Sequence, residues 1–128
     1  MPPARLLLVD DDKVLRTTLA HILELNHFTV TCAADASEAI LKIASQEFDV
    51  LLSDLHMPEP EDAGTVMIAM RKTHPRAVAL LLSAFPEPWS AACAANLHAD
   101  DVLAKPMEVP ALIHAITSRL ASGRIAPA

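Results

Sequence analysis

The fold of this chain is decided by the stretch RLLLVDDD, residues 5–12, in which an apolar run ends at three consecutive carboxylates. An uninterrupted apolar run of this length is typical of a strand buried on both faces, as in a parallel sheet covered by helices. Further runs of strand length recur later in the chain. We therefore predict five parallel strands, at residues 5–9, 28–32, 48–52, 78–82 and 101–104.

Helical patterns separate every pair of predicted strands. The first helix is expected to bury an apolar face made of Val14, Leu15, Leu19, Ile22 and Leu23, which recur at the three-to-four spacing of a helix. A second helix begins at a capping box formed by Asp35 and Glu38. The remaining helices are predicted at residues 65–73, at about 88–97, and from about Pro110 to Leu120. This alternation predicts right-handed crossovers and an α/β fold, a doubly wound three-layer sandwich with five helices.

Length and charge restrict the class of protein. A chain of 128 residues and 13.7 kDa has the size of one domain, which we assign to residues 1–122, with 123–128 as a tail or the start of a linker. The net charge of −6 disfavours direct binding to nucleic acid or to an anionic membrane surface.

Glycine and cysteine usage excludes other classes. Gly64 and Gly123 are the only glycines, so a glycine-rich phosphate-binding loop is absent from the sequence. Cys32 and Cys93 are isolated, which favours reduced thiols over a disulfide framework or a zinc site. With no signal-peptide core or membrane-length apolar stretch in the sequence, we expect a cytoplasmic protein.

Acidic and polar side chains follow the predicted strands. Asp10 to Asp12 follow the first strand, Asp54 the third, Ser83 the fourth and Lys105 the fifth. The carboxyl ends of parallel strands meet at one edge of the sheet, so these residues should converge. Several carboxylates in one place repel each other and favour a hard divalent cation, which we predict to be Mg²⁺. One carboxylate can then serve as a nucleophile toward a phosphoryl group.

Together these segments resemble the receiver domain of bacterial two-component response regulators, the CheY-like family. The resemblance is carried by VDDD at 9–12, DLHMP at 54–58, SA at 83–84 and DDVLAKP at 100–106, and it covers the chain from Arg5 to about Ala121. It implies a flavodoxin-like sheet of strand order 2-1-3-4-5. It also implies a phosphoacceptor function in two-component signal transduction.

The resemblance assigns a role to each site residue. Asp54 would accept a phosphoryl group from a phosphohistidine. Asp11, Asp54 and the main-chain carbonyl of His56 would bind Mg²⁺ directly, and Asp10 would act through a bound water. Ser83 and Lys105 would each contact one phosphoryl oxygen, and the peptide bond from Lys105 to Pro106 would be cis.

The implied partners are a sensor histidine kinase or a phosphotransfer protein, and either a second copy of the chain in a homodimer or a separate output domain. In such a phosphorelay the chain would catalyse only its own phosphorylation and dephosphorylation, so we do not expect an enzyme that turns over a metabolite.

Two positions depart from the family pattern. Val102 stands three residues before the lysine, where the family usually has an aromatic residue that rotates inward on activation. Gly64 lies ten residues after Asp54 rather than eight, so the loop 58–64 is expected to be two residues longer than usual.

Other functions stay open on the sequence. One alternative is a phosphorylation-independent receiver-like interaction module, which the Val102 and loop departures favour. Another is a Mg²⁺-dependent aspartyl-phosphate hydrolase, but His56 occupies the place where such phosphatases usually have a second acid.

Overall fold

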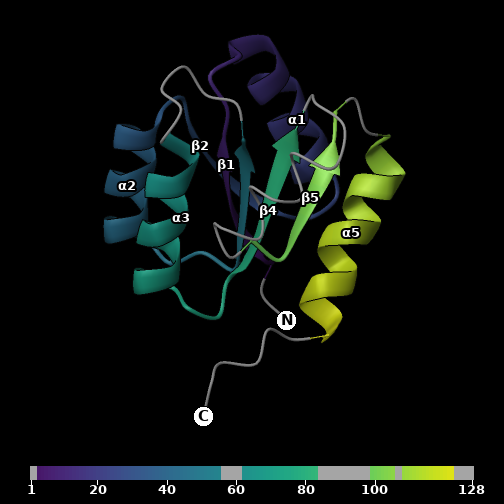
Figure 1. Cartoon of the computed structure of the whole chain (residues 1–128). Coiled ribbons are helices and arrows are strands. Elements are labelled where there is room, and N and C mark those ends of the chain that lie inside the picture. Colours follow the sequence, from purple (N-terminus) through teal and green to yellow (C-terminus); the bar gives the residue numbers. More distant parts are fainter. Residues whose placement is uncertain (1–2, 56–61, 84–98, 106–107, 123–128) are drawn as a thin grey trace.

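The structure is a computed structural model that describes residues 3–55, 62–83, 99–105 and 108–122. Strands and helices alternate along most of the chain (Figure 1). The elements are β1 (Arg5–Val9), α1 (Lys13–Leu25), β2 (Thr29–Ala33), α2 (Ala36–Ser45), β3 (Val50–Asp54), α3 (Asp62–Thr73), β4 (Val78–Ser83), β5 (Asp101–Ala104) and α5 (Val109–Ser122).

The five strands form one parallel sheet in the order β2-β1-β3-β4-β5, which confirms the predicted topology. Two strands begin later than predicted, β2 by one residue at Thr29 and β3 by two residues at Val50. Phe28 and Phe48, the predicted first residues of these strands, are buried just before them. The apolar runs therefore mark which residues are buried. The hydrogen bonds between the strands begin one or two residues after each phenylalanine.

Helices cover both faces of the sheet, as Figure 1 shows, with α2 and α3 on one face and α1 and α5 on the other. Successive β1 side chains enter opposite cores: Leu7 and Val9 pack in the cluster under α2 and α3, while Leu6 and Leu8 pack in the cluster under α1 and α5. All four are fully buried. This two-sided burial is why β1 has no polar alternation.

The prediction for α1 is wrong in its first turn. Leu19 and Leu23 are buried as expected, but Val14 is 76% exposed and Leu15 is 36% exposed, and Ala20 contributes to the buried face instead. Figure 1 shows the reason: α1 begins beyond the carboxyl ends of the strands, so its first turn has no sheet to pack against.

The other helices agree more closely with the sequence. The capping box of α2 is present, since Asp35 Oδ1 accepts from the Glu38 N–H at 2.8 Å, although the Glu38 carboxylate accepts from Ala34 N at 2.6 Å rather than from Asp35. Helix α3 starts at Asp62, three residues earlier than predicted, so Gly64 belongs to this helix and not to the loop. Helix α5 matches its prediction, and the predicted helix at 88–97 lies outside the described residues.

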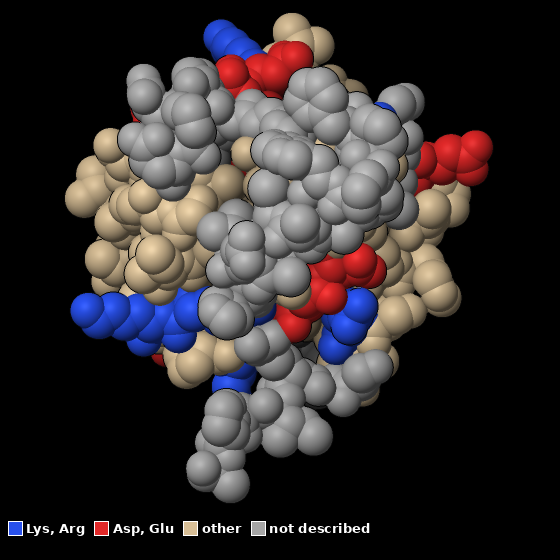
Figure 2. All heavy atoms as spheres, viewed as in Figure 1, with Lys and Arg blue, Asp and Glu red and all other residues tan. Residues whose placement is uncertain are grey.

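Two neighbouring aspartates at the start of β5 pair with arginines in different surroundings. Asp100 Oδ2 lies 3.0 Å from Arg71 Nη2 of α3 and also accepts from Ala79 N at 2.7 Å, and both side chains of the ion pair are largely buried. Asp101 Oδ2 lies 3.4 Å from Arg119 Nη2 of α5, and both of these side chains are about half exposed. Figure 2 shows acidic and basic atoms side by side over the start of β5 and the last turns of α5.

These adjacent pairs predict different stabilities for two matched variants. Asp100→Ala removes the carboxylate that pairs with the largely buried Arg71 guanidinium and accepts from the Ala79 N–H, and should lower the free energy of unfolding by about 3 kcal/mol. Asp101→Ala removes a solvent-screened pair and should cost less than about 1 kcal/mol. Urea unfolding of both variants measures the difference, and equal losses would contradict this account of how β5 is anchored.

Candidate functional site

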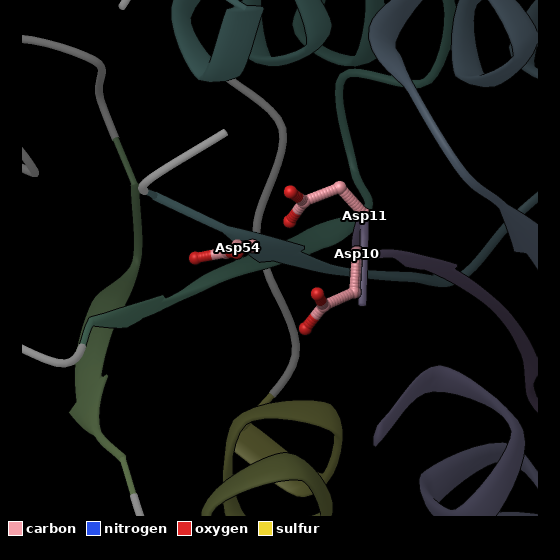
Figure 3. A group of neighbouring side chains, drawn as sticks. All are labelled: Asp10, Asp11 and Asp54. Carbon is pink, nitrogen blue, oxygen red and sulfur yellow. The ribbon is translucent and has the colours of Figure 1, made fainter. Parts of the chain in front are cut away.

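The carboxyl edge of the sheet gathers three carboxylates. Asp10 and Asp11 follow β1, and Asp54 is the last residue of β3, which pairs directly with β1 through Val9 and Ser53. One oxygen of each carboxylate lies within 4.8 Å of the others. Figure 3 shows the three side chains at this edge, with Asp10 and Asp11 coming from the end of β1 and Asp54 from the end of β3. The predicted convergence of these residues is thus observed.

Hydrogen bonds on both sides hold Asp10 in place. Its N–H donates to the Ala33 carbonyl at the end of β2 at 3.2 Å, and its Oδ1 accepts from the Asp12 N–H at 2.9 Å. The Asp12 carboxylate is engaged elsewhere, because its Oδ1 caps α1 by accepting from the Leu15 N–H at 3.1 Å. Asp12 therefore builds the turn that positions the cluster, and it does not belong to the cluster itself.

Lys105 supplies the positive charge of the site. Its Nζ lies 3.1 Å from Asp10 Oδ2 and 3.4 Å from Asp54 Oδ2, so one ammonium group bridges two strand ends. Asp10 and Asp54 are nearly inaccessible, at 1% and 5% exposure, whereas Asp11 is exposed. The bridge partly offsets the repulsion among the three carboxylates. It leaves Asp11 as the carboxylate that faces solvent.

Ser83 ends β4 at the same edge. Its side chain is buried, its neighbour Leu82 pairs with Asp54 across the sheet, and its carbonyl accepts from Lys105 N at 2.7 Å. The structure therefore places the predicted hydroxyl beside the strand that carries Asp54 and in direct main-chain contact with Lys105. His56 and Pro106, the other residues predicted for this site, lie outside the described part of the chain.

Ser53 is a residue of this site that we do not predict from the sequence. This residue is fully buried in β3, and its hydroxyl donates to the main-chain carbonyl of Asp54 at 3.2 Å. The bond satisfies a buried hydroxyl and fixes the backbone at Asp54. A serine inside the apolar run that ends at Asp54 was the available signal, because a polar side chain at a fully buried position needs a partner within the fold.

The residues present suit a hard divalent cation. The cluster offers only oxygen donors, one of them on an exposed side chain that a hydrated ion can approach. A carboxylate binds a metal in its deprotonated form, so a bound cation would itself favour the charged state of these side chains. Lys105 neutralises part of the charge without adding a nitrogen or sulfur donor that would favour a softer metal.

Comparison with known proteins gives the class of this chain. Residues 6–117 match the response regulator receiver domain family, and the chain belongs to that family. It is 36% identical over 118 residues to the transcriptional regulatory protein CpxR of Escherichia coli K12, covering 90% of this chain and 50% of that protein. It is 33% identical over 123 residues to the response regulator protein FleR of Pseudomonas aeruginosa, covering 95% of this chain and 25% of that protein. The chain thus spans half or less of the length of these two relatives.

Solved structures agree with this assignment. A CheY-like receiver domain protein from Methanospirillum hungatei superposes with a TM-score of 0.85 at 27% identity, covering 94% of this chain and 95% of that one. A response regulator from Burkholderia pseudomallei superposes with a TM-score of 0.82 at 26% identity, covering 93% of this chain and 69% of that one. That structure contains a phosphorylated aspartic acid, a calcium ion and citrate. Within the described ranges of the present chain, every helix is too short or too polar to cross a membrane.

The acidic cluster predicts stabilisation by divalent cations. Mg²⁺ at ten times its dissociation constant should raise the free energy of unfolding by about 1.4 kcal/mol, because a ligand that binds only the folded state stabilises that state. Thermal unfolding with and without MgCl₂ measures this as a rise of a few degrees in Tm. Asp11→Asn should abolish the rise. Asp12→Asn, which removes a neighbouring charge and keeps a good helix cap, should retain it.

If Asp11→Asn keeps the rise in Tm, the cation binds elsewhere. If Asp12→Asn loses the rise as fully as Asp11→Asn does, the effect is general charge screening.

Proposed function

We propose that this chain is a phosphoacceptor receiver domain in which Asp54 accepts a phosphoryl group. The observation that carries the proposal is the position of the Asp54 carboxylate, which is almost fully buried, lies 3.4 Å from the Lys105 ammonium and shares one sheet edge with two further carboxylates. A carboxylate in such a place serves neither as a helix cap nor as a solvated surface charge. It is suited to react with an electrophile that brings its own negative charge to a cationic group.

The proposed step is a direct transfer between two nucleophiles. An oxygen of the ionised Asp54 carboxylate forms a bond to phosphorus while the bond from phosphorus to the donor imidazole nitrogen breaks, and the electron pair leaves with that nitrogen. No general base is required for this step, because an ionised carboxylate has no proton to lose when it attacks. In this step Lys105 would pair with one phosphoryl oxygen and Ser83 would donate a hydrogen bond to another, so that charge is stabilised at the oxygens of the transferred group.

We assign the cation of this site as Mg²⁺, held by Asp11 and Asp54 with Asp10 acting through water; His56 completes the set that we predict. When bound, a divalent cation neutralises charge on the phosphoryl oxygens. The exposed Asp11 carboxylate and the oxygen-only donor set support this assignment, because Mg²⁺ prefers few carboxylates and keeps several waters.

We further propose that the donor is a phosphohistidine on a sensor kinase or phosphotransfer protein, and that the chain transmits its state to a partner or to an output domain. The family membership and the relatives that are transcriptional regulators support this role. The chain would turn over only its own phosphoryl group. Val102 is half-buried against the core beneath α3. Because it is not aromatic, the phosphorylated state would be transmitted to a partner differently from the way it is in relatives with an aromatic side chain at this position.

The test is the intact mass after incubation with acetyl phosphate and MgCl₂. The parent chain should gain one phosphoryl group, and Asp54→Asn should gain none while remaining folded, because the substitution removes the nucleophile and one of the repelling charges. Asp49→Asn is a matched control, since Asp49 precedes β3 at the opposite edge of the sheet and should leave phosphorylation unchanged.

Full labelling of Asp54→Asn would overturn the acceptor assignment. If the folded parent binds Mg²⁺ and gains no phosphoryl group from acetyl phosphate or from a phosphohistidine donor, the chain is instead a phosphorylation-independent interaction module.

A further inference from the structure

Arg16 of α1 contacts the main chain of the acidic turn. Its Nη1 donates to the carbonyl oxygen of Asp10 at 2.7 Å, and its own N–H donates to the Asp12 carbonyl at 2.9 Å as part of the first helical turn. The side chain is half-buried, so the bond from the guanidinium to the carbonyl is partly shielded from water. A short hydrogen bond from a charged donor in such a place is stronger than a neutral one.

This contact fixes the peptide unit between two members of the cluster. The carbonyl of Asp10 and the N–H of Asp11 belong to one planar peptide group. The direction of the carbonyl therefore also sets the direction of the Asp11 N–H and the position of the Asp11 Cα. The N–H of Asp10 is already held by Ala33 of β2. Both peptide planes that flank Asp10 therefore have a fixed orientation, one set by β2 and the other by Arg16.

Arg16 also lies near the end of β2. Burial raises the pKa of the Cys32 thiol, and the Arg16 guanidinium partly offsets this effect by its positive charge. Cys32 pairs with Leu8 in the sheet, so the guanidinium is close to both strand ends that flank the turn. The guanidinium therefore brings a second positive charge, besides that of Lys105, close to the turn that carries Asp10 and Asp11.

We propose that Arg16 is a positioning residue for the cation site: by holding the Asp10 carbonyl it orients the exposed Asp11 carboxylate toward Asp10 and Asp54. The inference rests on the proposed function of the cluster and extends it to a residue outside the acidic set. Arg16 is not a catalytic residue, because it contacts the backbone of the turn and none of the reacting groups.

The test is the affinity for MgCl₂ of the whole unphosphorylated chain, measured by titration calorimetry. Arg16→Ala should raise the Kd for Mg²⁺ about tenfold, as expected when a group that orients a metal ligand is removed. Arg16→Lys keeps the charge and one donor and should restore part of the affinity. Two control variants should have a Kd for Mg²⁺ within about twofold of the parent. Lys13→Ala removes an exposed positive charge from the same turn of the helix. Arg71→Ala removes another arginine whose Nη1 donates to a main-chain carbonyl, that of Ala77, at 2.7 Å.

A second readout separates positioning from stability. Urea unfolding should show a larger loss of stability for Arg71→Ala, whose ion pair is largely buried, than for Arg16→Ala, although only Arg16→Ala loses Mg²⁺ affinity. In single-turnover phosphorylation with acetyl phosphate, Arg16→Ala should need about ten times more Mg²⁺ for half the maximal rate, with the maximal rate itself unchanged.

The outcomes distinguish the two proposals. If the parent binds Mg²⁺ and accepts a phosphoryl group but Arg16→Ala binds the ion equally well, the positioning role is wrong and the proposed function stands. The same holds if Lys13→Ala weakens binding as much as Arg16→Ala, because the effect is then one of charge alone. If the folded parent neither binds Mg²⁺ nor is phosphorylated, the proposed function fails first.

Discussion

The parallel pairing of β1 with β3 is the constraint on which the site depends. Because the two strands run in the same direction and end together, residues that are 44 positions apart in sequence, Asp10 and Asp54, share one ammonium group. Bringing three carboxylates together costs electrostatic energy, because they repel each other. Several neighbouring groups offset this repulsion or hold the carboxylates in place. Lys105 brings opposite charge, Asp12 brings a backbone N–H, and the buried residues of β1 and β3 keep the strand ends from separating.

Much of this arrangement could be predicted from the sequence because it follows from local patterns. The apolar runs located the strands, the alternation with helices implied parallel crossovers, and strand ends then had to meet at one edge. Asp10, Asp11, Asp54, Ser83 and Lys105 each stand at such an end, and the structure brings them to one edge of the sheet. Whether a residue follows the end of a strand depends only on its position along the chain, so the sequence is enough to predict it.

The sequence did not predict contacts that depend on how the helices and strands are placed relative to one another in space. Periodicity placed Val14 and Leu15 on the buried face of α1, yet that turn extends beyond the sheet and is exposed. The bond from Arg16 to the Asp10 carbonyl has no signature, because arginine on the polar side of a helix usually faces water. The difference between Asp100 and Asp101 is equally hidden, since two identical adjacent residues reach arginines on different helices.

The short strand β5 bears on the solubility of the fold. It is the last strand of the sheet, and the end of a sheet offers unpaired N–H and C=O groups to any extended chain that approaches. Here the Val102 N–H donates to Asp101 Oδ1 at 2.8 Å, so a side chain of the strand itself occupies this donor. The other oxygen of this carboxylate pairs with Arg119 at 3.4 Å. An incoming strand would have to displace that bond, which disfavours intermolecular β-pairing at this position of the strand.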